Sequence, residues 1–262
     1  MLAHHLLGAP QDMSAAPPLV VLHGLFGSAR NWRGVGRRLG ERRRVIALDL
    51  PNHGASPHSA DCSYAAQAAA VAQTLGALDV GPIELMGHSM GGKVAMATVC
   101  RQLHPVSRLY VLDIGIRANR PERALLDAMR ALPLGEIETR GDAERWLGER
   151  VADRATLLFL LTNLVRRGTD DPGEGAFRWQ LGLDELAGDF DSIGASPLRP
   201  GDRWTGPVHF LGGGESDYLR AADLAALRVP FPEATLDFLP GVGHDVHVEG
   251  GEAFLHWVEE RS

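Results

Sequence analysis

Short apolar runs alternate with longer amphipathic or alanine-rich segments over the first 115 residues. The runs are rich in Val, Ile and Leu and end near glycine or proline, which is typical of buried strands. Four such runs predict strands at residues 17–24, 44–54, 82–87 and 107–115. Three intervening segments predict helices at residues 28–42, 63–78 and 91–103. Strands that alternate with helices favour βαβ units and a mostly parallel sheet.

The alternation stops near residue 116. Residues 117–200 have helical patterns, with turn-forming residues at 169–175 ("TDDPGEG") between two of the expected helices. The final part of the chain predicts strands at 206–214 and 234–240 and an amphipathic helix at 250–261. The sequence therefore predicts an α/β core, residues 1–116 and 201–262, with an inserted helical lid, residues 117–200.

Composition narrows the expected partners and location. The formal net charge of −7 and the isoelectric point near 5.9 argue against a nucleic-acid or anionic-membrane partner. Cys62 and Cys100 are too few for a disulfide framework, which suits a reducing compartment. No run reaches the roughly 18 apolar residues of a membrane span, and the start of the sequence does not resemble a secretory signal. We expect a cytoplasmic monomer or dimer with no stable membrane insertion.

The segment "LMGHSMGGKV", residues 85–94, contains the first candidate catalytic residue. Ser89 follows an apolar strand and precedes a helix, the position at which an α/β sheet presents ligands. Gly87 and Gly91 leave room for a sharp turn, and the helix N-terminus favours a developing negative charge. Ser89 is therefore predicted to be a nucleophile.

A serine hydroxyl needs a base to accept its proton. His244, in the glycine-rich "LPGVGHDVH" after the last predicted strand, lies at the same edge of the sheet and is the expected base. His247 lies three residues further on, but a lone H-x-x-H pair is a weak signal for a metal site. His88 is interpreted as a structural or pocket residue.

An oxyanion hole requires two backbone N–H groups that point to one place. Met90, directly after Ser89, is expected to supply one. The segment "LHGLFGS", residues 22–28, follows the first core strand and is expected to supply the other from Leu25, with Phe26 as the less favoured choice.

At this point the sequence resembles the α/β-hydrolases, and more narrowly the ybfF-type bacterial esterases and their eukaryotic relatives. The similarity lies in "HGLFGSARNW", "DLPNHGASPH", "GHSMGGKVAM", "LLTNLV" and "GVGHDVHVE", which occur in the same order and cover most of the chain. The resemblance implies Ser89 as nucleophile, His244 as base, a helical lid and no cofactor. Asp245 departs from the family pattern, which has an aromatic residue after the catalytic histidine.

The third member of a Ser-His-Asp triad stays open between two residues. Asp113 ends the strand beside the nucleophile strand, and the ybfF-type relatives imply this position. Asp217 follows the next strand, where most α/β-hydrolases have their acid. The apolar lid residues Phe159 and Trp179, together with Phe26 and His88, are expected to line the substrate pocket.

The expected reaction is hydrolysis of a carboxylic ester or thioester, as a small-molecule substrate, through an acyl-enzyme with a Ser-His-Asp triad. Perhydrolysis and carbon–carbon bond hydrolysis use the same triad and remain alternatives. A ligand receptor with a residual hydrolase site is an alternative of another class.

Overall fold

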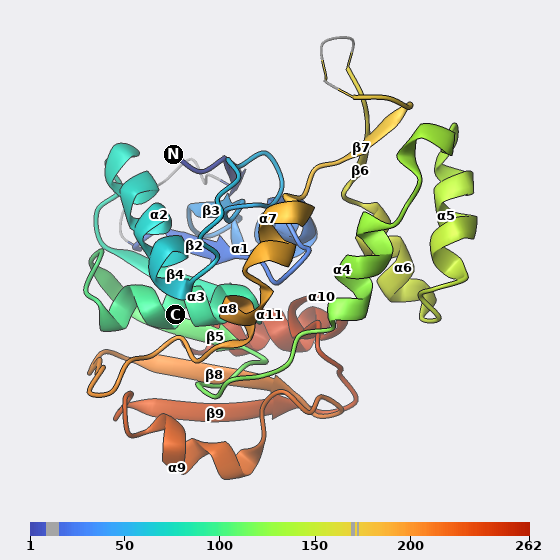
Figure 1. The fold of residues 1–262 in the computed structure, drawn as a ribbon. Helices are drawn as coiled ribbons and strands as arrows, with labels where there is room; N and C mark the ends of the chain where they lie inside the picture. The colour runs from blue at the N-terminus through green and yellow to red at the C-terminus, as the bar shows by residue number, and fades with distance from the viewer. Residues whose placement is uncertain (9–15, 169–170, 172) are drawn as a thin grey trace.

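A seven-stranded sheet forms the centre of the protein in the computed structural model, which describes residues 1–8, 16–168, 171 and 173–262 (Figure 1). The strand order is β1-β3-β2-β4-β5-β8-β9. The strands are β1 (His4–Gly8), β2 (Leu19–Leu22), β3 (Val45–Leu48), β4 (Ile83–His88), β5 (Val106–Leu112), β8 (Val208–Gly213) and β9 (Ala234–Leu239).

All neighbouring strands of this sheet are parallel except β1, which pairs antiparallel with β3. The predicted mostly parallel α/β fold is thereby confirmed. The sequence pattern does not predict strand β1, because its sequence His-His-Leu-Leu-Gly has no clear alternation and the strand lies half-exposed at the sheet edge.

Helices cover both faces of the sheet, and the alternation of side chains along the strands explains why. Leu19 and Val21 of β2 contact one apolar cluster, and Val20 and Leu22 contact the other. The first cluster includes α1 and α11, and the second includes α2 and α3. The core helices are α1 (Arg33–Leu39), α2 (Tyr64–Ala77), α3 (Met90–Cys100), α9 (Leu224–Leu227), α10 (Val246–Glu249) and α11 (Gly251–Glu259), with 3₁₀ turns η1 (Ala29–Trp32) and η3 (Ala221–Asp223).

The segment between β5 and β8 lies largely beyond the carboxyl ends of the strands, where α4, α5 and α6 form a separate layer (Figure 1). Its helices are α4 (Arg123–Arg130), the 3₁₀ turn η2 (Leu134–Glu136), α5 (Arg140–Gly148), α6 (Arg154–Leu161), α7 (Leu183–Gly188) and α8 (Phe190–Gly194). No helix in the described part of the chain is both long and apolar enough to cross a bilayer.

The insertion is not entirely helical, which corrects the sequence-based expectation. β6 (Leu164–Arg166) and β7 (Phe177–Trp179) form an antiparallel pair where two helices were predicted to flank a turn. Three-residue strands are too short to show a period of two, so the sequence pattern could not reveal them. Part of the predicted turn, residues 169–170 and 172, lies outside the described residues.

Lys93 joins the two chain segments that enter and leave this insertion. The amide of Asn119 donates to the carbonyl of Gly194 over 2.8 Å, so the two segments run side by side. The Lys93 ammonium, on α3, donates to Oδ1 of Asn119 and, over 2.8 Å, to the carbonyl of Ala195. Its side chain is buried, and burial lowers its pKa to about 8.

Candidate active site

Ser89 occupies a strained turn between β4 and α3. Its φ of 50° and ψ of −116° lie outside the regions that L-residues prefer, a conformation that costs about 1–3 kcal/mol. The neighbouring glycines permit the turn. A Cβ atom on Gly87 would lie 2.2 Å from the Gly91 carbonyl oxygen, and one on Gly91 would lie 2.5 Å from that of His23. The turn therefore requires glycine at both positions and presents Ser89 to the cavity described below.

His244, in the loop between β9 and α10, contacts Asp113. Its Nδ1 lies 2.7 Å from Oδ2 of Asp113, which directly follows β5 and is fully buried. The same carboxylate accepts hydrogen bonds from the amide of Gly213, over 3.0 Å, and from the hydroxyl of Ser216. A carboxylate that accepts from several donors at once has a fixed orientation, here toward the imidazole. The sequence reasoning missed Ser216, which no local pattern links to a residue 103 positions earlier.

Asp217, the other acid considered from the sequence, lies away from His244. Its side chain is 95% exposed and pairs with Arg220 over 3.1 Å. The chain turns outward after β8, so Ser216 faces the buried carboxylate and Asp217 faces solvent. The expectation that Asp217 could hold the histidine is thus corrected by its position.

The loop that carries Leu25 is held by two neutral histidines. The Phe26 amide donates to Nε2 of His53 over 3.1 Å, so this N–H is already engaged. His23 accepts from the Leu50 amide over 2.9 Å through its Nε2. Burial lowers the pKa of His23 to about 4 and that of His53 to about 3, so both rings stay neutral near pH 7.

The amides of Leu25 and Met90 differ from that of Phe26, since neither has an acceptor among the described residues. Both residues line the same cavity as Ser89. The insertion also contacts this loop, because the Asn163 amide group donates to the Phe26 carbonyl over 2.8 Å. Phe26, whose φ is 60°, is therefore held through both its N–H and its carbonyl group. Asn163 was another residue that sequence reasoning missed.

A cavity of about 540 Å³ opens over Ser89, between the strand ends and the insertion. Three of the predicted pocket residues, Phe26, His88 and Phe159, line it. Trp179 does not, which corrects that expectation: it lies on β7, and its Nε1 donates to the Met129 carbonyl over 3.0 Å. The walls contributed by the insertion are otherwise mainly apolar, from Leu125, Leu160 and Ile193.

Further histidines surround the cavity. His88 donates from Nε2 to the His244 carbonyl over 2.9 Å, and the ring of His247 stacks on Trp32 with 4.3 Å between centroids. Burial lowers the pKa of His88 to about 4 and that of His247 well below its usual value. Tyr218 stacks on His244 from another side, with 4.2 Å between the ring centroids.

Comparison with known proteins agrees with this arrangement. Residues 17–250 match the family model described as the alpha/beta hydrolase fold. The chain is 37% identical over 248 residues to the mouse sn-1-specific diacylglycerol lipase ABHD11, covering 91% of this chain and 78% of that protein. It is 30% identical over 247 residues to esterase YbfF of Escherichia coli K12, covering 94% and 92% of the two chains.

Among solved structures, a marine microorganism esterase superimposes with a TM-score of 0.91 at 28% identity, covering 99% of this chain and 98% of that one. The strand order, the strained serine turn and these similarities lead to the same assignment. The chain belongs to the α/β-hydrolase family.

Proposed function

We propose that this protein is a serine hydrolase that cleaves carboxylic esters or thioesters through an acyl-enzyme. The observation that carries the proposal is the bond between His244 and the buried Asp113 beside a cavity that also exposes Ser89. Because His244 Nδ1 faces the carboxylate, its proton sits there and Nε2 is left to act as base.

In the first half-reaction, the Ser89 hydroxyl attacks the substrate carbonyl while His244 Nε2 accepts its proton. The resulting oxyanion accepts hydrogen bonds from the Leu25 and Met90 amides, whose acceptor-free N–H groups support this role. His244 then gives the proton to the leaving alcohol or thiol. Asp113 stabilises the imidazolium throughout.

In the second half-reaction, His244 removes a proton from a water molecule, which attacks the acyl carbonyl. The bond between the acyl group and Ser89 Oγ then breaks, His244 returns the proton to Oγ, and a carboxylic acid is released. We propose that residues 117–200 act as the lid and that its apolar wall, including Phe159, holds the acyl chain. The names of the mouse and Escherichia coli relatives support lipid esters and simpler esters as the first substrates to test.

The test is a labelling and turnover experiment with Ser89→Ala. A fluorophosphonate probe should label the wild type at Ser89 and leave the variant unlabelled, and hydrolysis of p-nitrophenyl butyrate should fall by at least about 10³-fold. Asp217→Asn, which changes an exposed carboxylate, serves as the matched control. Wild-type turnover in Ser89→Ala would reject the mechanism, and analysis of the products separates hydrolysis from perhydrolysis and carbon–carbon cleavage.

A further inference from the structure

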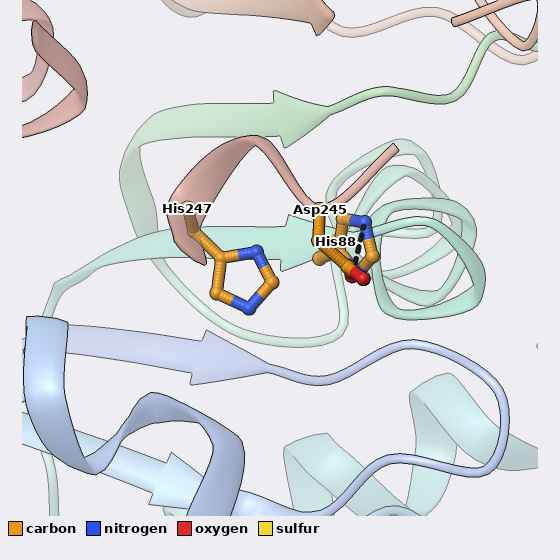
Figure 2. Close-up of side chains that lie close together, drawn as sticks. All are labelled: His88, Asp245 and His247. Carbon is orange, nitrogen blue, oxygen red and sulfur yellow. Dashed lines mark ion pairs between the residues drawn. The ribbon is translucent and has the colours of Figure 1, made fainter. Parts of the chain in front are cut away.

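His88, Asp245 and His247 form a cluster beside the catalytic centre (Figure 2). Each offers one ligand atom, and these atoms all lie within 4.8 Å of one another. His88 Nε2 and Asp245 Oδ1 are 3.8 Å apart. Both histidines are buried, while the Asp245 side chain is 57% exposed. All three residues line the cavity, so an ion can reach them from solvent.

His247 gives a second, independent indication of a ligand. Its Nδ1 is buried and has no hydrogen-bond partner among the described residues. Figure 2 shows this nitrogen on the side of the ring that faces His88 and Asp245. A buried polar atom without a partner is uncommon in a folded protein. The ring of His247 stacks on Trp32, which fixes the plane of the imidazole.

We propose that His88, Asp245 and His247 bind a divalent transition-metal ion of the Zn²⁺ type, which inhibits the enzyme. Two imidazoles, one carboxylate and a water molecule are a common ligand set for zinc, whereas Mg²⁺ and Ca²⁺ prefer oxygen ligands. Zinc ligands at about 2.0–2.1 Å in a tetrahedron lie roughly 3.3 Å apart, so ligand atoms that now lie within 4.8 Å of one another must approach by up to about 1.5 Å. Part of this movement can come from the exposed Asp245 side chain, and the rest requires small shifts of the two imidazoles.

Metal binding is expected to inhibit because, without metal, the cluster helps to hold His244 in place. His88 Nε2 now donates to the His244 carbonyl. An ion bound at this nitrogen displaces its proton to Nδ1 and removes the hydrogen bond that holds the His244 backbone. The rings of His88 and His244 are also 4.7 Å apart, so a doubly charged ion opposes formation of the His244 imidazolium. This inhibitory effect rests on the proposed function, whereas metal binding does not.

Asp245 is the ligand that can be changed with the least disturbance, because its side chain is 57% exposed. Asp245→Asn removes the charge at almost constant shape.

Metal binding is measured first, on chelator-treated Ser89→Ala protein, so that turnover is not needed. Co²⁺ should bind one per chain and give the intense visible absorption of a tetrahedral site. Asp245→Asn and His247→Gln in the same background should each weaken Co²⁺ and Zn²⁺ binding at least tenfold, with Asp217→Asn as the unaffected carboxylate control. Absence of a tetrahedral spectrum, or equal affinity in all variants, overturns the site.

Inhibition is measured second, on the protein with Ser89 intact. Zn²⁺ should slow ester hydrolysis, excess EDTA should reverse the effect, and Asp245→Asn should require at least tenfold more Zn²⁺, relative to its own metal-free rate. Equal Zn²⁺ sensitivity in wild type and Asp245→Asn would place the inhibiting ion elsewhere and overturn the proposal. A protein that binds Co²⁺ as expected but hydrolyses no ester refutes the proposed function and leaves the metal site intact.

Discussion

His244 is held by neighbours that are far away in the sequence. Asp113 engages its Nδ1, His88 engages its backbone carbonyl, and Tyr218 stacks on its ring. Each contact restrains a different degree of freedom: the tautomer, the loop position and the plane of the imidazole. In the role of base that we propose for His244, a ring restrained in this way needs little reorganisation when it accepts a proton.

Replacement of the acid tests this arrangement most directly. In Asp113→Asn the amide NH₂ group cannot accept the Nδ1 proton, so the imidazole is driven toward the wrong tautomer. The same change in the triad of a serine protease lowers kcat by about 10⁴-fold, and we expect a loss of about 10³–10⁴-fold here. Asp217→Asn should change kcat less than about threefold, because Asp217 is exposed and pairs only with Arg220 among the described residues. Measurement of kcat for both variants on one ester tests which carboxylate is the acid. A large loss of kcat in Asp217→Asn would contradict the assignment of Asp113.

Ser89 and His244 could be brought together from the sequence because Ser89 directly follows β4 and His244 lies in the loop after β9. Parallel strands bring such positions to one edge of the sheet. The sequence could not separate Asp113 from Asp217, since both also follow strands. The distinction depends on which way the chain turns after β8, and that turn is stabilised by Ser216 across 103 residues. The role of Asn163 could not be predicted either, because its contact with Phe26 spans 137 residues.

At the scale of elements, the two aromatic side chains of the insertion that were predicted to line the pocket have different surroundings. Phe159 on α6 faces the cavity, whereas Trp179 on β7 packs against the insertion itself and hydrogen-bonds to Met129. The strand pair β6–β7 turns Trp179 away from the site, and its three-residue strands were below what a sequence pattern can reveal. The two residues therefore form a matched pair for testing the acyl pocket.

Phe159→Ala should enlarge the cavity and move the preferred p-nitrophenyl ester to a longer acyl chain, with at least a fivefold change in relative kcat/KM between C4 and C10. Trp179→Ala should instead lower the free energy of unfolding by about 2 kcal/mol, because it removes a partly buried ring, and should leave chain-length preference unchanged. The chain-length preference of both variants is measured as kcat/KM on a panel of p-nitrophenyl esters. Their free energy of unfolding is measured by urea titration. Equal effects of the two substitutions on chain preference would contradict this division.

At the scale of the whole molecule, buried neutral histidines make stability depend on pH. Burial lowers the pKa values of His23, His53, His88 and His247 below the value of about 6.5 expected in the unfolded chain. Between pH 6.5 and about 4 the unfolded chain therefore binds protons that the folded chain does not. Stability is full above pH 6.5 and is lost as the pH falls through this range.

We expect the free energy of unfolding, from urea titrations at pH 7.5, 6.5, 5.5 and 4.5, to be constant above pH 6.5 and to fall below it. Each such histidine adds a slope of up to about 1.4 kcal/mol per pH unit. His53→Gln, which retains a side-chain acceptor for the Phe26 amide, should make the slope shallower. A flat profile down to pH 4.5 would show that the four histidines are not kept neutral by the fold.

Lys93, which ties together the two ends of the insertion, also determines how the protein can be attached to other materials. The chain has 26 lysine and arginine residues, and Lys93 is the only lysine. Because its amine is buried and engaged by Asn119 and Ala195, an N-hydroxysuccinimide ester should leave Lys93 unlabelled in the native protein. Peptide analysis by mass spectrometry should find Lys93 unmodified in buffer and modified after unfolding in urea. Attachment through amines would then leave the two ends of the insertion, and the cavity beneath it, free of cross-links.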